Sequence, residues 1–295
     1  MTTDTLPKTV VLHLGAHKTA STHLQHAIIA AKPFDDVAFF GPRALRDKGQ
    51  TIPERFGFPL DPEDAVVAPQ SPAQMLRDMA AGAARLVISE ETFAGKLQRG
   101  WGRIPTPLYF TAPARVATFA QIVAEAGGPA IDLCLGVRNP TDYLGSAYSQ
   151  ILRGNRIVLP EKYRAKNAIA DIDWADYVAR LRAVKGVGKI TVWAYENYTD
   201  VFGQICKALI GRTDIPFPDS LVQPRLSTKA VDAILIGKSF GGPDLIQRAA
   251  EALPIGPDKP AYDLYDPAEH AASRALYQDQ CATIAAMPDV TFLQN

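Results

Sequence analysis

The sequence has few of the features that mark exported or membrane-bound proteins. Its three cysteines, Cys134, Cys206 and Cys281, lie far apart and form no CxxC pair, which argues against a redox or metal motif. The first residues show no basic segment followed by an apolar one, and no later stretch reaches the ~18 uninterrupted apolar residues of a membrane-spanning helix. We therefore expect buried free thiols, no membrane insertion and a cytoplasmic location.

The chain also lacks an excess of either charge. It has 31 Lys and Arg residues against 31 Asp and Glu residues. This balance gives no global field to gather nucleic acid or anionic membranes, so we expect no nucleic-acid partner, and any anion site must be local. The hydrophobic content of 47% is sufficient for a sizeable core. The sequence leaves the oligomeric state open.

Short apolar runs alternate with amphipathic helical patterns over the first two thirds of the chain. The strand-like runs cover residues 9–14, 85–89, 131–137 and 190–194. The helical patterns between them cover residues 21–31, 72–84, 115–126 and 174–184. Because each parallel connection needs a crossover that covers a sheet face, this order predicts an α/β fold with a central parallel sheet of about four to five strands flanked by helices on both faces.

The last third of the chain shows mainly helical patterns, at residues 201–210, 228–239, 244–253 and 267–287. The final run, VTFL, is compatible with a last edge strand, but the sequence does not decide whether it forms one. We expect a single domain, with a core over about residues 9–210 and a helical C-terminal part over about 211–295. Long loops are expected at residues 41–72, 95–113 and 153–173, and loops of this length in compact domains are usually functional or mobile.

The segment between the first strand and the first helix has the composition of a phosphate-binding loop. It reads Gly15-Ala16-His17-Lys18-Thr19-Ala20-Ser21-Thr22. At such a position, main-chain N–H groups, the helix dipole and a lysine can hold an anion together. A Walker A loop needs glycine before the lysine, so His17 disfavours an ATP or GTP machine. The alternative is a helix start capped by Ser21 or Thr22, with Lys18 solvated.

A second motif closes the third strand-like run. It reads Arg138-Asn139-Pro140-Thr141-Asp142 and is followed by Ser146. A guanidinium and a nearby hydroxyl can hold a phosphate, whereas the alternative is a helix start with Asp142 as cap and Pro140 as turn residue. Both motifs follow strands of a parallel sheet, where open α/β sheets bind their ligands.

Together these segments resemble the PAPS-dependent sulfotransferases, where PAPS is 3′-phosphoadenosine-5′-phosphosulfate. The run HKTASTHLQ is similar to the 5′-phosphosulfate loop of bacterial members, with Ala20 where the family usually has glycine, a change that helical dihedrals would accommodate. The Arg138 to Ser146 segment is similar to the 3′-phosphate motif, and Tyr195-Glu196 is similar to the Tyr-Glu that ends a later strand in that family.

The resemblance implies a P-loop-like fold and transfer of a sulfuryl group from PAPS to a hydroxyl or amine acceptor, leaving 3′,5′-adenosine bisphosphate (PAP). No metal is expected. Lys18 would be catalytic, and the residues implied to bind the donor are Gly15, His17, Lys18, Thr19, Ala20, Ser21, Thr22, Arg138 and Ser146. Two alternatives stay open: an ATP-dependent phosphotransferase and a nucleotide-binding relative without turnover.

The general base is expected at Glu90 or Glu91, which follow the second predicted strand. In a continuing strand the two side chains point in opposite directions, and the resemblance favours Glu91. A surface carboxylate that caps the next helix is the alternative. Four of the five histidines lie between His13 and His26, but their spacing matches no metal motif, and His13 is interpreted as a core residue.

The acceptor side is less well defined, and we expect a small molecule or a glycan there. Arg225 and Lys229 lie where the resemblance places a nucleotide-binding loop. Basic residues that either line the acceptor channel or form a solvated loop are Arg153, Arg156, Lys162, Arg164 and Lys166. Aromatic residues that either stack on a sugar or phenol or pack the loops are Phe56, Phe58, Trp101, Tyr109 and Phe110.

Overall fold

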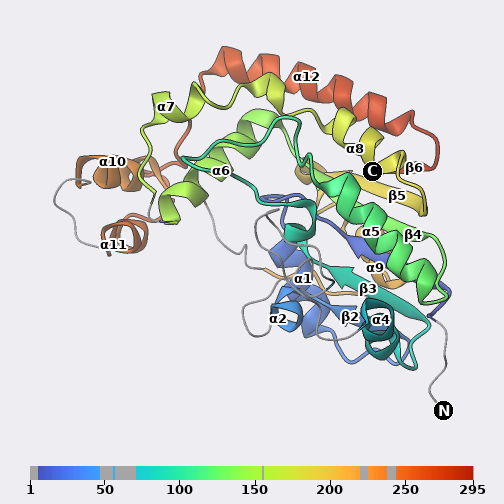
Figure 1. Cartoon of the computed structure of the whole chain (residues 1–295). Coiled ribbons are helices and arrows are strands. Elements are labelled where there is room, and N and C mark those ends of the chain that lie inside the picture. The colour runs from blue at the N-terminus through green and yellow to red at the C-terminus, as the bar shows by residue number, and fades with distance from the viewer. Residues whose placement is uncertain are drawn as a thin grey trace.

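A computed structural model describes residues 6–46, 56, 71–154, 156–219, 225–237 and 244–294 of the chain. Within these residues the centre is one sheet of six parallel strands in the order β2-β3-β1-β4-β5-β6 (Figure 1). The strands are β1 (Thr9–His13), β2 (Val37–Phe40), β3 (Arg85–Ser89), β4 (Ile131–Val137), β5 (Val187–Ala194) and β6 (Val290–Leu293).

The prediction of an α/β fold with a parallel sheet is confirmed, but the expected four to five strands are too few. At one edge the sequence does not predict β2, because its four residues are too short to show a strand period. At the other edge the VTFL run is β6, which pairs with β5 and places Val290 opposite Ile190. The described residues of the C-terminal part therefore include this last strand in addition to helices.

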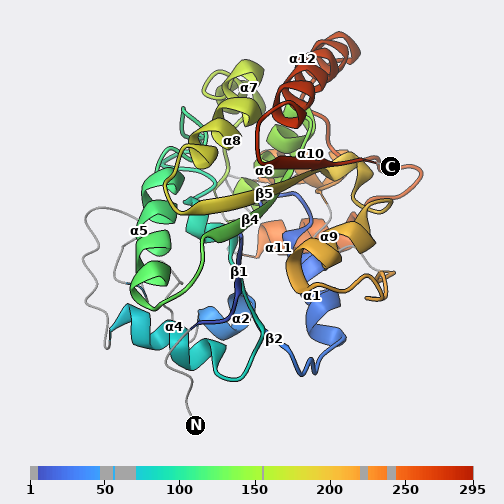
Figure 2. The ribbon, with the colours of Figure 1, turned by 90° about the vertical axis from the view of Figure 1, so that its right-hand side faces the viewer.

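Helices cover both faces of the sheet (Figure 2). Val11 of β1 belongs to a hydrophobic cluster with residues of α1 and α9, whereas Val10 and Leu12 belong to the cluster on the opposite face. This division follows from the alternation of side chains along a strand. The helices on the first face are α1 (Ser21–Ala30) and α9 (Phe202–Ile210). Those on the second face are α4 (Pro72–Ala80), α5 (Ala112–Glu125) and α8 (Trp174–Arg182).

The remaining helices lie beyond the carboxyl edge of the sheet and along its β5–β6 side (Figure 1). The long helix α12 contacts α6, α8 and β6, and α10 contacts α11. These helices are α6 (Pro140–Arg153), α10 (Thr228–Gly237), α11 (Leu245–Ala252) and α12 (Pro267–Ala285). Shorter helical segments are α2 (Pro42–Leu45), α7 (Pro160–Arg164) and 3-10 turns at Glu91–Ala94, Ile169–Asp171 and Tyr195–Asn197. The loop predicted over residues 153–173 thus contains α7 and a 3-10 turn.

The strand order creates a natural binding point between β1 and β4. From β1 the chain continues to β2 at one edge of the sheet, whereas from β4 it continues to β5 toward the other edge. Connections that diverge from neighbouring strands open a crevice at the carboxyl edge, where α/β sheets bind ligands. Lys18 follows β1 and Arg138 follows β4, so the fold brings both candidate anion ligands to this crevice.

Candidate functional site

The loops after β1 and β4 open onto one cavity of about 580 Å³. Its walls also include residues of α1, α2, the turn after β3, and α6. The cavity is therefore built from segments that lie far apart in sequence. The predicted site residues that line it are Lys18, Ala20, Ser21, Thr22, Glu91, Arg138 and Ser146.

The β1–α1 loop has a conformation that few sequences accept. Gly15 has a φ of +57°, and a β-carbon there would lie 2.4 Å from Oγ of Ser21, so both backbone and space exclude a side chain. Lys18 and Ala20 also have positive φ, of 68° and 66°. Non-glycine residues persist in this region only where the surroundings fix them, and such strain occurs often at ligand-binding loops.

Ala20 differs from the expectation in conformation. Its φ of 66° and ψ of 18° are left-handed, not the helical dihedrals that would accommodate the methyl group at no cost. Ala20 is also the N-cap of α1, and no side chain caps this helix, so the interpretation of Ser21 or Thr22 as the cap is wrong. The first amide groups of α1 therefore have no side-chain acceptor among the described residues and are available to an anion.

Three predicted ligands support the loop instead of lining the cavity. The buried ring of His17 has Nδ1 3.0 Å from the hydroxyl of Tyr109, and the main-chain N–H of His17 donates to the same hydroxyl at 3.0 Å. The hydroxyl of Thr19 donates to the carbonyl oxygen of Ala16 at 2.6 Å and accepts from its N–H at 3.2 Å. We therefore correct the role of His17, Thr19 and Gly15 from ligand contact to positioning of the loop.

Arg138 connects the two loops. Its Nη1 donates a hydrogen bond of 2.7 Å to the main-chain carbonyl oxygen of Lys18, and the guanidinium lies over the ring of Tyr195, 4.0 Å from the centroid. Nε of Arg138 is buried and has no hydrogen-bond partner among the described residues. A largely buried guanidinium without a carboxylate partner is costly, so the site favours a bound anion.

Several cations converge on the cavity. Burial lowers the pKa of the Lys18 ammonium, Glu91 opposes this change, and Arg138, Arg153 and Arg225 add to it. The pKa of Arg138 is also lowered, mainly by burial and further by Arg225. Lys18 forms no salt bridge with any residue that the structure describes. An anion with two separated charges would relieve both the burial and the mutual repulsion of these groups.

The two adjacent glutamates have different environments. The fully buried carboxylate of Glu90 accepts two hydrogen bonds from Arg46, at 2.6 and 2.9 Å, and two from the N–H and hydroxyl of Thr92, at 3.0 and 2.8 Å. The hydrogen bonds with Glu90 raise the pKa of the Arg46 guanidinium. Glu91 instead lines the cavity. Glu90 is thus occupied as a structural anion, which excludes it as the base, and Glu91 remains the candidate.

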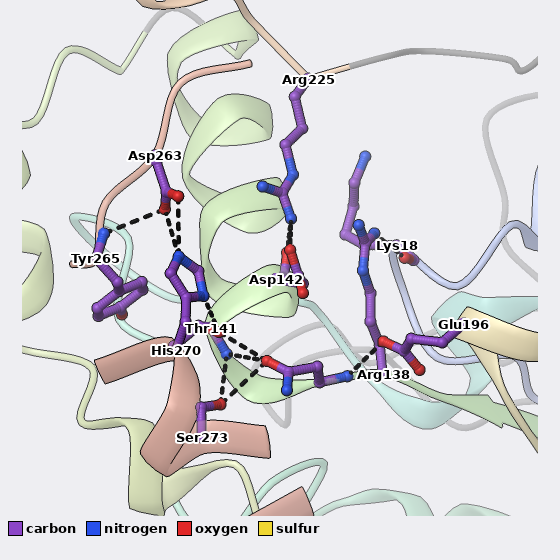
Figure 3. A network of polar contacts seen from close by, with 11 residues as sticks. Lys18, Arg138, Thr141, Asp142, Glu196, Arg225, Asp263, Tyr265, His270 and Ser273 are labelled. Atoms are coloured by element: carbon purple, nitrogen blue, oxygen red, sulfur yellow. Dashed lines mark hydrogen bonds and ion pairs between the residues drawn. The ribbon is translucent and has the colours of Figure 1, made fainter. Parts of the chain in front are cut away.

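A polar network fixes the start of α6 and with it the turn that carries Arg138 (Figure 3). Oδ1 of Asn139 accepts hydrogen bonds from the N–H and hydroxyl of Thr141, at 3.1 and 2.7 Å, and from the hydroxyl of Ser273 at 3.0 Å. The main-chain N–H of Asn139 donates to Glu196 at 2.9 Å. The Tyr-Glu pair after β5 therefore contributes twice, since Glu196 holds this turn and its neighbour Tyr195 stacks on the guanidinium.

Arg225 reaches the cavity from a segment that is distant in sequence. Its Nη2 donates to the main-chain carbonyl oxygen of Asp142 at 2.8 Å and to its carboxylate at 2.6 Å (Figure 3). The interpretation of Asp142 as the helix cap is therefore wrong, because Asn139 caps α6 and Asp142 pairs with Arg225. Lys229 does not line the cavity.

Several cavity residues were not assigned to the site from the sequence, and simple sequence signals exist for two of them, Gln150 and Tyr195. Gln150 lies four residues after Ser146 on α6, so the helical period alone places it on the same face. Tyr195 directly follows β5, and the rule that ligands bind at the carboxyl ends of parallel strands applies to it as well.

The histidines that cluster in sequence separate in the fold. The interpretation of His13 as a core residue is confirmed, because it is buried, stacks on Trp193 and has Nδ1 2.7 Å from Oγ of Ser89. Nδ1 of His23 lies 2.9 Å from the hydroxyl of Tyr198. Within the described ranges, no group of three or more His, Cys, Asp or Glu residues has a metal-binding arrangement.

None of the described helices combines the length and the apolar character needed to cross a membrane.

Comparisons with known proteins find similarity among solved structures. No protein-family model matches the chain, and no curated protein matches it significantly. Among solved structures, a sulfotransferase from Alicyclobacillus acidocaldarius is similar, with a TM-score of 0.48 and 16% sequence identity. The alignment covers 95% of this chain and 96% of that chain. An identity of 16% is too low to transfer residue roles, so these depend on the chemistry of the cavity itself.

Proposed function

We propose that the protein is a sulfotransferase that uses PAPS as donor and releases PAP. One observation carries this proposal: the guanidinium of Arg138, which opens the second motif, donates a hydrogen bond of 2.7 Å to the main-chain carbonyl oxygen of Lys18 in the first, and both residues line the same cavity. A nucleotide with a phosphosulfate at one end and a phosphate at the other matches two cationic positions that share one cavity. The volume of about 580 Å³ is of the size that small-molecule sites occupy.

The residues of the β1–α1 loop would act on the phosphosulfate. Sulfuryl transfer spreads negative charge toward the leaving phosphate oxygen, and a preorganised ammonium with amide donors stabilises such charge. Lys18 supplies the ammonium, and the uncapped start of α1 supplies the amide groups. The hydroxyls of Ser21 and Thr22 line the same wall of the cavity.

The second motif would hold the 3′-phosphate. Arg138 offers a planar pair of donors, and Ser146 adds a hydroxyl from the second turn of α6. Arg225 lines the cavity beside them and is already paired with Asp142, so it adds positive charge without needing the ligand as its only partner.

Glu91 would accept the proton of the acceptor hydroxyl or amine. It is the acidic residue among those that line the cavity, and its charge opposes the lowering of the Lys18 pKa by burial, which supports a role close to that lysine. The cavity extends past Glu91 along α1 and α2, where a small-molecule or glycan acceptor would enter. This arrangement favours an enzyme over a binding protein without turnover.

We further propose a cytoplasmic location without nucleic-acid partners or membrane insertion. Cys134 and Cys206 are free and buried, and burial raises the pKa of both thiols to about 12. Thiols of this kind remain reduced and unreactive in a reducing compartment. The balanced charge of the chain supports the absence of nucleic-acid partners.

The proposal is tested with PAPS labelled with ³⁵S and a panel of saccharide, phenol and amine acceptors. We expect label on at least one acceptor, and a rise in melting temperature with PAP but not with ATP and Mg²⁺. Metal-dependent transfer of phosphate from ATP, or stabilisation by ATP and Mg²⁺ alone, would replace the proposal by an ATP-dependent phosphotransferase.

A further inference from the structure

Trp101 is the most exposed aromatic residue of the loops that the sequence analysis singled out. Its side chain is 69% exposed, whereas Phe56 and Tyr109 are buried. Phe58 lies outside the described residues. Tryptophan is enriched at binding interfaces because its ring is apolar and its N–H is polar, so this exposed indole is a candidate contact.

The loop presents Trp101 at the tip of a tight turn. Arg99 and Arg103 form an antiparallel bridge with main-chain hydrogen bonds of 2.8 and 3.1 Å, and Trp101 is the central residue between them. The flanking residues Gly100 and Gly102 have φ of +51° and +84°, and a β-carbon at Gly102 would lie 2.5 Å from Cδ1 of Ile151. The two glycines therefore let the turn approach α6 closely while its central indole faces outward.

Side chains from the neighbouring segment hold this turn. Asn167 donates to the carbonyl oxygen of Gly102 at 3.1 Å and accepts from the N–H of Ile104 at 2.7 Å. Arg156 donates to the carbonyl oxygen of Gly100 at 2.8 Å. A turn held at both glycines positions the indole before any ligand binds, which lowers the entropic cost of binding.

Two hollows share the indole of Trp101 as a lining residue. One of about 650 Å³ is lined by Arg99, Trp101, Arg103, Lys166 and Asp171 among others, and one of about 320 Å³ by Trp101, Lys162 and Lys166 among others. Lys162 and Lys166 form no salt bridge with any residue in the part of the chain that the structure describes. Lys162 and Lys166 thus contribute positive charge beside the indole in a chain whose net charge is zero.

We propose that Trp101 and these cations form a binding platform for an acidic oligosaccharide, one that carries carboxylate or sulfate groups. The C–H face of a sugar ring stacks on the electron-rich face of an indole. Ammonium and guanidinium groups on both sides bind the acidic substituents by charge-assisted hydrogen bonds. Two hollows that share the indole suit a chain of several sugar units, with one ring on Trp101 and its neighbours on either side.

This platform is separate from the cavity of Lys18 and Arg138, because the two share no lining residue. Binding to the platform needs no donor nucleotide, so its test is independent of the proposed sulfuryl transfer. Failure of one proposal therefore leaves the other unaffected.

Tryptophan fluorescence provides a direct test in the full chain. The chain has three tryptophans, and Trp174 and Trp193 are buried, so quenching by acrylamide reports on Trp101. We expect a hexamer of galacturonate and a heparin hexasaccharide each to protect Trp101 from the quencher. Neutral maltohexaose and inorganic polyphosphate should protect it far less, since the first lacks charge and the second lacks rings.

Calorimetric titrations of variants then locate the site. Trp101→Ala should weaken binding of the acidic hexasaccharides about tenfold, and Trp101→Phe should retain most of the affinity. Lys166→Gln should weaken binding severalfold. Control variants on other surfaces, Ile236→Ala and Lys185→Gln, should have no effect, and Lys18→Ala should bind as the wild type does.

Several results would overturn the proposal. Unchanged affinity of Trp101→Ala would remove the indole from the site. Equal affinity for polyphosphate would indicate a nonspecific polyanion surface, and equal affinity for maltohexaose would remove the need for charge. Loss of binding in Lys18→Ala would move the acidic oligosaccharide to the other cavity.

Discussion

The side chain of Arg138 donates a hydrogen bond of 2.7 Å to the main-chain carbonyl oxygen of Lys18, a residue 120 positions earlier in the sequence. This bond ties the loop after β1 to the turn after β4 at the point where the sheet reverses its order. It also holds the Arg138 guanidinium beside the main chain of Lys18 before a ligand binds. Preorganised positive charge of this kind is what a doubly anionic nucleotide requires.

Replacing Ala20 by glycine tests the strain in the β1–α1 loop. Because Ala20 has a left-handed conformation, Ala20→Gly should raise the free energy of unfolding by about 1 kcal/mol. The matched control is Ala179→Gly in the regular part of α8, which should lower it by about 1 kcal/mol. Urea denaturation measures both. A loss of stability in Ala20→Gly similar to that of the control would contradict the assigned conformation.

Replacing each of the two glutamates after β3 should change a different property, turnover for Glu91 and stability for Glu90. Glu91→Gln should keep the melting temperature and lower turnover by roughly 10²- to 10⁴-fold, because it removes the proposed general base. Glu90→Gln should lower the free energy of unfolding by roughly 1.5–3 kcal/mol, because it weakens charged hydrogen bonds from Arg46 and Thr92. Calorimetry and a transfer assay distinguish the two effects, and the reverse pattern would exchange the roles.

The affinity for the donor nucleotide should depend on pH through Lys18. Burial lowers the pKa of this ammonium, so it loses its proton at a lower pH than an ordinary lysine. Because only the charged form attracts an anion, the affinity for PAP should fall as the pH rises through the lowered pKa. In Lys18→Arg this fall should disappear from the alkaline range, and a fall that persists there would assign it to another group.

His13 should make the folded state sensitive to acid. Burial lowers its pKa from 6.5 to about 4, so the unfolded chain binds a proton that the folded chain excludes. The contribution is fully present above pH 6.5 and is lost as the pH falls toward 4, with a maximum of about 3 kcal/mol. Urea denaturation at pH 7 and pH 5 should show this loss, and His13→Phe should reduce it. The buried His17, whose pKa is also lowered, acts in the same direction.

The sequence predicts the strands that carry the site because each is a run of apolar residues next to a helical pattern. Residues 85–89 and 131–137 were predicted with the bounds of β3 and β4. The short β2 was missed because four residues reveal no period. Its pairing with β3 is seen only in the folded chain. Edge strands of this length are specified by their neighbours more than by their own residues.

The sequence predicts the site residues that directly follow strands. It does not predict which side chains point into the cavity. His17 and Lys18 are adjacent, but only Lys18 lines the cavity, because the left-handed turn at Lys18 directs the two side chains differently. Glu90 becomes a structural anion through Arg46, which is 44 residues away in sequence. Arg225 joins the site through its pairing with Asp142. Such long-range pairs are properties of the fold and leave no local pattern.

The most direct test of the account is a calorimetric comparison of PAP with 5′-AMP and 3′-AMP, which each lack one phosphate. We expect PAP to bind roughly 10- to 100-fold more tightly than either. Arg138→Ala should abolish the advantage of PAP over 5′-AMP, and Lys18→Ala should abolish its advantage over 3′-AMP, while Arg212→Ala at the far edge of the sheet should change neither. Equal affinity of the wild type for all three nucleotides would contradict the claim that one cavity holds both anionic ends.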